Sequence, residues 1–278
     1  MTHWNLDSIP WDRFDRSRVN PQLLALARGA CLVEFNADAY TDYLCRVFDD
    51  DAELQAQFRT WGEEEKQHGL ALKKWVELAD PDFDFERSLT LFRSAYQQVP
   101  DEGGDSVRGS KARELAARCI VETGTSSYYS ALRDASEEPV LTEICRLIAL
   151  DEVRHFKMFR EPLDRKYGPE EKLGRLPRFK VVAGRILETS DDELSFAYRA
   201  GNFPDEPIEP TRSKEYSDDF MKRISLLYRP EHYQMILSLA VKVVGIHISL
   251  RIRKLLAHAG YRLLRFRYPI TTAISLRY

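Results

Sequence analysis

Apolar residues recur at helical spacing over long stretches of this chain, and no convincing alternation typical of β-strands accompanies them. Asn20 followed by Pro21 predicts a helix N-terminus, because Asn caps the first turn and proline fits its first position. A stop signal follows at Asp80-Pro81. The sequence therefore predicts an all-α fold with four long helices at residues 21–48, 51–79, 111–134 and 139–167.

Shorter helices are expected around these four. A helix at 85–98 and a Gly- and Asp-rich loop at 100–109 form a long connection that suits the crossover of a ferritin-like four-helix bundle. Residues 201–210 contain three prolines and predict a loop, and residues 268–278 carry no clear pattern. Extra C-terminal helices are expected at 170–187, 217–227 and 230–259. We expect three regions: a lead at 1–19, a dimetal helix bundle at 20–168, and a helical extension packed on the bundle at 169–278.

Two copies of one pattern give the chain its strongest functional signal. Each is a lone glutamate followed about thirty residues later by Glu-x-x-His: Glu34 precedes its motif by 31 residues, and Glu122 precedes the second by 30. Helix bundles that hold two metal ions use this inventory, with one Glu from each of two helices and Glu-x-x-His from the other two. The pattern predicts a dinuclear metal centre with the ligands Glu34, Glu65, His68, Glu122, Glu152 and His155.

The spacing explains how these ligands can meet. In each predicted hairpin, the lone glutamate and the Glu-x-x-His motif both lie roughly fifteen residues from the turn that joins the two helices. This is about 22 Å along each helix axis, so in an antiparallel pair they stand at the same height. Residues three apart share a helix face, so the Glu and His of each motif can point at one site. Cys-Leu-Val-Glu, ending at Glu34, also resembles Cys-Ile-Val-Glu, ending at Glu122, which indicates duplication of one helical hairpin.

Four carboxylates and two imidazoles form an oxygen-rich ligand set without a thiolate. Such a set favours iron or manganese over zinc or copper, and two divalent ions would balance the four negative charges. A ligating His usually shares its other ring nitrogen with a carboxylate. Asp151 is the expected partner of His68. Glu64 is the mirror-image candidate for His155, with an exposed surface acid as the alternative.

With these motifs, residues 20–168 resemble the soluble acyl-carrier-protein desaturases of the ferritin-like di-iron carboxylate superfamily. The ligand motifs are highly specific for the superfamily and less so for the desaturases. The resemblance implies that the six ligands hold two iron ions, as an Fe/Fe pair with Mn/Fe as an alternative. It also implies that the Thr125 hydroxyl assists oxygen activation, and that Asp151 links His68 to an electron route. A hydrogen bond from Thr125 back to Val121 is the alternative role for that hydroxyl.

Two features depart from that family. The chain is shorter than typical plant desaturases, and its basic C-terminal segment matches no family feature. Leu72 stands one turn after His68, where the small subunit of ribonucleotide reductase would have its radical tyrosine, and this counts against a stable tyrosyl radical. Tyr129, seven residues after Glu122, could approach the site, although a tyrosine at such a position is more often part of the core.

We therefore expect an O₂-dependent di-iron oxidoreductase, a desaturase or hydroxylase that acts on an aliphatic, fatty-acyl substrate. The alternatives are a di-iron oxygenase of an amine or amino-acid-derived metabolite, a ligand-binding Mn/Fe oxidase, and a ferritin-like iron- or peroxide-handling protein. Chains of the last class are usually much shorter. No flavin or iron–sulfur motif is present, so electrons should come from an external, ferredoxin-like donor. Trp4, Trp11 and Trp61 are relay candidates, with simple packing as the alternative.

Charge is distributed unevenly along the 278 residues. The formal charge is −3, but residues 229–278 carry nine Lys or Arg and only one acid, so this segment is +8 and the remainder −11. The body gives no reason to expect nucleic-acid binding, whereas the basic segment could dock an acyl carrier protein or an anionic membrane surface, or offset the acidic body. The absence of a secretory signal and the helical placement of all four cysteines favour a cytoplasmic protein, or one peripheral at a membrane. A homodimer is compatible with the sequence.

Overall fold

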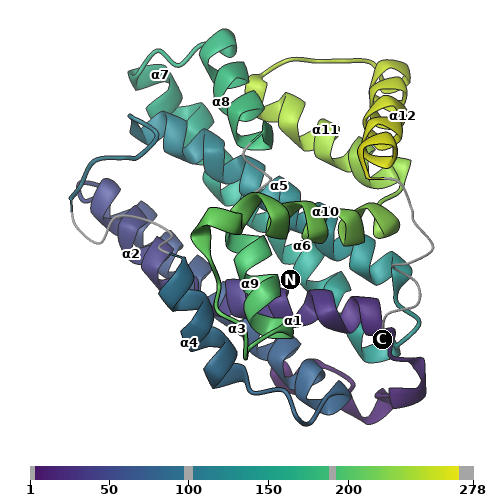
Figure 1. Ribbon diagram of the computed structural model, residues 1–278. Helices are drawn as coiled ribbons and strands as arrows, with labels where there is room; N and C mark the ends of the chain where they lie inside the picture. The colour runs from purple at the N-terminus through teal and green to yellow at the C-terminus, as the bar shows by residue number, and fades with distance from the viewer. Residues whose placement is uncertain (1–3, 97–102, 188–191, 269–278) are drawn as a thin grey trace.

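The computed structural model describes residues 4–96, 103–187 and 192–268, and within these ranges all regular structure is helical (Figure 1). The expectation of an all-α fold is confirmed. Helix α1 packs along α3, α5 packs along α6, and the two pairs meet where α3 contacts α6. These four central helices are α1 (Pro21–Phe35), α3 (Ala52–Ala79), α5 (Lys111–Ala135) and α6 (Pro139–Pro162).

Side-chain caps determine where the central helices begin. Asn20, Asp51, Ser110 and Glu138 each accept a hydrogen bond from a backbone N–H in the first turn of the helix that follows. Such a cap stabilises a helix by about 1 kcal/mol. The buried Glu138 carboxylate also accepts from Trp75 Nε1 at 2.7 Å, so the cap of α6 connects that helix to α3.

The predicted helix at 21–48 is instead two helices, α1 and α2 (Asp38–Val47), with a turn after Phe35. The Asn36 side-chain oxygen accepts a hydrogen bond at 2.8 Å from Arg93 on α4 (Phe85–Ala95). At the turn α1 approaches α3 so closely that a Cβ on Gly69 would lie 2.6 Å from the Phe35 nitrogen. The break therefore places Glu34 in the last turn of α1, directly against α3.

Shorter helices cover the central four. Helices α8 and α11 pack against α5, α9 packs against α1 and is flanked by α4 and α10, and α12 packs mainly against α11. Helix α6 continues into a π-helical turn at Leu163–Tyr167, close to the predicted end of the fourth helix. The remaining α-helices are α7 (Gly168–Glu170), α8 (Arg175–Leu187), α9 (Asp192–Asn202), α10 (Ser213–Leu227), α11 (Pro230–Val244) and α12 (Leu250–Arg267).

Two parts of the C-terminal region differ from the prediction. Helix α9 was not predicted, because it depends on close packing against α1. A Cβ on Gly29 of α1 would lie 2.8 Å from the Tyr198 Cα. The predicted helix at 230–259 is broken at Gly245, whose φ of 75° lies in the left-handed region that ends many helices. Three predictions concern residues outside the described ranges. They are the end of a helix at 97–98, part of a loop at 100–102, and the segment without a clear pattern at 269–278.

A polar layer separates two apolar clusters in the core. On α3 and α5, residues of one cluster precede the ligand positions and residues of the other cluster follow them, and on α6 the order is reversed. On α3, for example, Trp61 belongs to one cluster and Ala71 to the other, with Glu65 and His68 between them. The ligands thus occupy a plane across the middle of the core. No helix among the described residues is both long and apolar enough to cross a membrane.

Candidate metal centre

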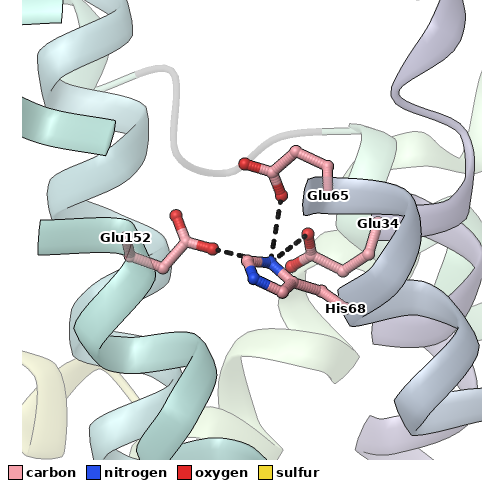
Figure 2. A group of neighbouring side chains, drawn as sticks. All are labelled: Glu34, Glu65, His68 and Glu152. Carbon is pink, nitrogen blue, oxygen red and sulfur yellow. Dashed lines mark ion pairs between the residues drawn. The ribbon is translucent and has the colours of Figure 1, made fainter. Parts of the chain in front are cut away.

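The six predicted ligands meet in this polar layer, on four helices. Glu34 comes from α1, Glu122 from α5, and one Glu-x-x-His motif from each of α3 and α6. Figure 2 shows the carboxylates of Glu34, Glu65 and Glu152 converging on His68. None of the six residues is more than 6% exposed. Four carboxylates at this depth need compensating positive charge, because an unpaired buried carboxylate is strongly disfavoured.

The ligands form two overlapping groups. Within each group, one potential ligand atom per residue lies within 4.8 Å of all the others. Glu65 and Glu152 belong to both groups. The first group is completed by Glu34 and His68, and the second by Glu122 and His155. Each group could hold a metal ion, with two carboxylates common to both.

Three unpaired atoms among the six predicted ligands are of the kind that a metal ion would use. His68 Nδ1 lies 3.4 Å from Glu65 Oε2 and 3.5 Å from Glu152 Oε1, and His155 Nδ1 lies 3.1 Å from Glu65 Oε1. Both Nδ1 atoms and Glu152 Oε1 are buried without a hydrogen-bond partner. Buried polar atoms are rarely left unpaired. Two imidazole nitrogens and several carboxylate oxygens that face one another therefore fit a hard or borderline divalent metal.

The opposite nitrogen of each histidine faces an acid outside the ligand set. His68 Nε2 lies 3.1 Å from Asp151 Oδ2, and His155 Nε2 lies 2.7 Å from Glu64 Oε2. Arg154 lies 2.9 Å from both acids and connects them. Glu64 is thus not a free surface acid. A carboxylate at Nε2 fixes the ring orientation and leaves Nδ1 available to a metal.

Trp4 extends this arrangement to the N-terminal lead. Its Nε1 donates to Asp151 Oδ2 at 2.7 Å, and its ring stacks on His68 with the centroids 5.8 Å apart and the planes 4° apart. Trp4 is half-buried, whereas His68 is fully buried. A continuous contact therefore runs from the protein exterior through Trp4 and Asp151 to a ligand histidine. Trp11 donates to Leu6 O and does not take part.

Thr125 contacts the site directly. Its hydroxyl lies 2.7 Å from Glu152 Oε2, and it also lies 3.3 Å from Val121 O. The contact to the carboxylate is the shorter one. The back-bond to Val121 that the sequence offered as the alternative is therefore also present, but it is longer than the contact to the carboxylate.

Arg118 is a part of the site that the sequence did not suggest. Its Nη2 donates to Glu122 Oε1 at 2.7 Å, and its guanidinium lies over the rings of Tyr40, Trp61 and Phe159. It is only 7% exposed. One signal was available: Arg118 stands four residues before Glu122, on the same helix face. In the other copy of the hairpin, Ala30 stands four residues before Glu34, so the arginine is present in one half of the site and not in the other.

Tyr129 reaches the other half. Its hydroxyl donates to Glu34 Oε1, and the side chain is 1% exposed. Burial is the largest factor that raises the pKa of Tyr129, and the nearby Glu34 carboxylate adds to it. The phenol therefore stays protonated and acts as a donor to a ligand carboxylate. Tyr129 is therefore a core residue that also contacts the site.

Protonation in the metal-free site reflects its crowding. Burial raises the pKa of Glu34 well above its usual range, and the adjacent Glu65 raises it further. Burial alone would lower the pKa of His68, but its contacts with Asp151 and Glu152 outweigh burial and raise that pKa well above 6.5. His155 behaves likewise, through Glu122 and other carboxylates. Protons on the histidines thus supply the positive charge that cations would otherwise bring.

Comparison with known protein families and curated proteins identifies no family for this chain. No protein-family model and no curated protein sequence matches the chain. What the site can do therefore follows from its own groups: two buried histidines whose unpaired nitrogens face two shared carboxylates.

Proposed function

We propose that this protein is a ferritin-like di-iron oxidoreductase that uses O₂ to oxidise an aliphatic substrate, with a fatty-acyl group as the leading class. The observation that carries the proposal is the pair of overlapping ligand groups that share Glu65 and Glu152. Four carboxylates and two histidines from four helices are the inventory of ferritin-like dimetal bundles. The resemblance of residues 20–168 to acyl-carrier-protein desaturases supports the substrate class.

When bound, two iron ions would supply the oxygen chemistry needed to break an unactivated C–H bond. The chain would hold and orient them. Glu65 and Glu152 belong to both groups and would contribute to holding both ions, while Glu34 with His68 and Glu122 with His155 would complete one group each. Fe/Fe is the pair we propose, with Mn/Fe as the variant that metal analysis distinguishes. The two apolar clusters on either side of the site keep water away from it.

Electron delivery should depend on Trp4. We expect Trp4→Phe to retain the stacking on His68 but lose the hydrogen bond to Asp151, and so to slow reduction of the loaded site by an external donor roughly tenfold or more. Stopped-flow reduction of protein with verified metal content measures this. Trp11→Phe is the matched control, because Trp11 donates only within the N-terminal lead. Equal reduction rates in the two variants would remove Trp4 from the route.

The Thr125 hydroxyl should matter for turnover more than for metal loading. Thr125→Val conserves the shape but removes the donor to Glu152, so we expect unchanged metal content and turnover reduced roughly 10- to 100-fold. Thr123→Val is the matched control, since Thr123 is buried on the same helix and donates to Cys119 O instead. Unchanged turnover and unchanged peroxide release in Thr125→Val would leave Thr125 with a packing role.

The reaction class is tested by substrate-dependent O₂ consumption. Protein loaded with Fe(II) without oxygen is mixed with O₂ and a reductant, in the presence of long-chain acyl thioesters or of amines and amino acids. The proposal expects stimulation by the acyl compounds and a product that has lost two hydrogens or gained one oxygen. Stimulation by amines alone would favour an oxygenase of amine-derived metabolites. Iron deposition without any organic product would favour an iron-handling protein.

A further inference from the structure

Helix α12 carries an apolar stripe that no part of the described chain covers. Leu255, Leu263 and Phe266 are 69%, 67% and 86% exposed, and Ile252 and Leu256 are about half exposed. With Ala259 they recur at three- and four-residue steps, so they fall within an arc of roughly 100° on one helix face. Contiguous exposed apolar surface of this kind usually marks a place where something binds.

The stripe faces away from the protein because the opposite face of α12 is the packed one. Ala257 is 1% exposed, and Gly260 lies so close to Tyr233 on α11 that a Cβ there would be 3.1 Å from its ring. Arg253 donates to Ser238 Oγ and Arg265 to Ser225 O, so these two cations also point inward. Figure 1 shows α12 at the periphery, beside the part of α11 where that helix begins.

Cations border the stripe on both sides. By helical position, Arg251 and Arg262 flank one edge and Arg267 the other, and all three are exposed. The helix contains no Asp or Glu. An exposed apolar face bordered by Arg and Lys, on a helix that is not apolar overall, is the pattern of a helix that lies in the plane of a membrane interface.

We propose that α12 docks the protein on an anionic lipid surface, with Ile252, Leu255, Leu256, Leu263 and Phe266 buried at the headgroup boundary and Arg251, Arg262 and Arg267 among the phosphates. A lipid interface satisfies both features, since acyl chains receive the stripe and headgroups receive the cations. An acidic protein surface would match the cations but leave leucines and Phe266 against polar groups. The inference does not depend on the metal site.

Vesicle flotation tests the proposal on the full-length protein. We expect binding to vesicles of phosphatidylcholine mixed with phosphatidylglycerol, and little binding to phosphatidylcholine alone. Leu255→Ser/Leu263→Ser/Phe266→Ser should weaken binding by roughly tenfold or more. Arg251→Gln/Arg262→Gln/Arg267→Gln should weaken it on the order of a hundredfold at low salt and reduce its salt sensitivity.

The matched control compares single exposed leucines on two helices. Leu263→Ser should reduce binding, whereas Leu150→Ser should not, because Leu150 is 57% exposed on α6, outside α12. Thermal midpoints should stay near wild type in all variants, since the altered side chains point to solvent.

Three results would overturn the proposal. The first is wild-type protein that floats with no vesicle, and the second is α12 variants that float as well as wild type. The third is an α12-dependent complex with acyl carrier protein, or an α12-dependent dimer, in protein that binds no lipid, because the stripe would then serve a protein partner.

Discussion

Replacing Glu65 or Glu152 with alanine should reduce the metal content from about two ions per chain to nearly none. These two carboxylates belong to both ligand groups, so each substitution removes a ligand from both ions at once. Glu34→Ala should behave differently, because Glu34 belongs to one group only, and we expect about one ion to remain. Metal analysis after loading and desalting, on protein shown to be folded by circular dichroism, measures the difference.

Glu114→Ala is the matched control for removing a buried glutamate. Glu114 is fully buried on α5, but its carboxylate accepts from Tyr40, Tyr43 and Ser106 rather than facing the ligands. Its substitution should leave about two ions bound. If Glu65→Ala and Glu114→Ala retained the same metal, Glu65 would not be a shared ligand. If wild-type protein bound no metal at all, the six residues would form only a buried ion network, and the di-iron proposal would fail.

The convergence of the six predicted ligands was predictable because their spacing repeats. Glu-x-x-His occurs by chance in many helices, but two copies at nearly the same distance from a lone glutamate, 31 and 30 residues, imply two hairpins of similar length. The turn after Phe35 could not be predicted, because it depends on how closely α1 approaches Gly69 on α3. That contact forms only in the assembled protein. The prediction of one continuous helix over 21–48 was therefore wrong, while Glu34 still lies with the other predicted ligands.

The residues around the ligands were harder to predict. Asp151 and Glu64 could be proposed because each precedes a motif glutamate by one residue. Trp4 could only be named as a candidate, since 147 positions separate it from Asp151 and only the tertiary fold brings them together. Arg118 was missed because a cation was not expected beside a predicted metal site. Its three aromatic neighbours stabilise it there together with Glu122.

Gly245 divides the C-terminal region into two helices where the sequence predicted one. The sequence suggested a single helix over 230–259 with its apolar face on the bundle. The left-handed conformation at Gly245 ends α11 and lets α12 start in a new direction. As a result, α11 buries apolar residues such as Val243, while Leu255 and Phe266 on α12 stay exposed. The charge of this segment was compatible with an acyl carrier protein or an anionic membrane surface, and the exposed stripe favours the lipid surface.

Removing the metal should make the stability of the protein fall as pH rises from about 5 to 8. In the metal-free protein, burial raises the pKa of Glu122 to about 8 from 4.5, although Arg118 and His155 oppose the shift. The pKa of Glu34 is raised as well, again mainly by burial. Both carboxyls hold protons more tightly when folded than when unfolded, so rising pH favours the unfolded state across this window.

The histidines act in the same direction. Their carboxylate neighbours raise the folded pKa of His68 and His155 against the opposing effect of burial, so their stabilisation is complete below pH 6.5 and declines as pH rises through the folded values. Burial would raise the pKa of Glu65, but hydrogen bonds from Glu34 and the two histidines outweigh it and lower that pKa. For Glu152, burial and the adjacent Glu65 would raise the pKa, and contacts with His155 and His68 outweigh both and lower it. Their stabilisation is present above pH 4.5 and is lost only in more acidic solution, so they do not offset the trend.

Metal-bound protein should show the opposite dependence, because a metal competes with protons for the same ligand atoms and binds more tightly as pH rises. We expect the difference in Tm between metal-bound and chelated protein to widen by roughly 10 °C or more between about pH 5.5 and pH 8. Differential scanning calorimetry with and without chelator measures this. Glu122→Gln removes one of the raised carboxyls, so chelated Glu122→Gln protein should lose less stability than chelated wild type over this range. A chelated wild type whose Tm stays constant or rises from pH 5.5 to 8 would mean that the buried carboxylates do not depend on a cation for their charge balance.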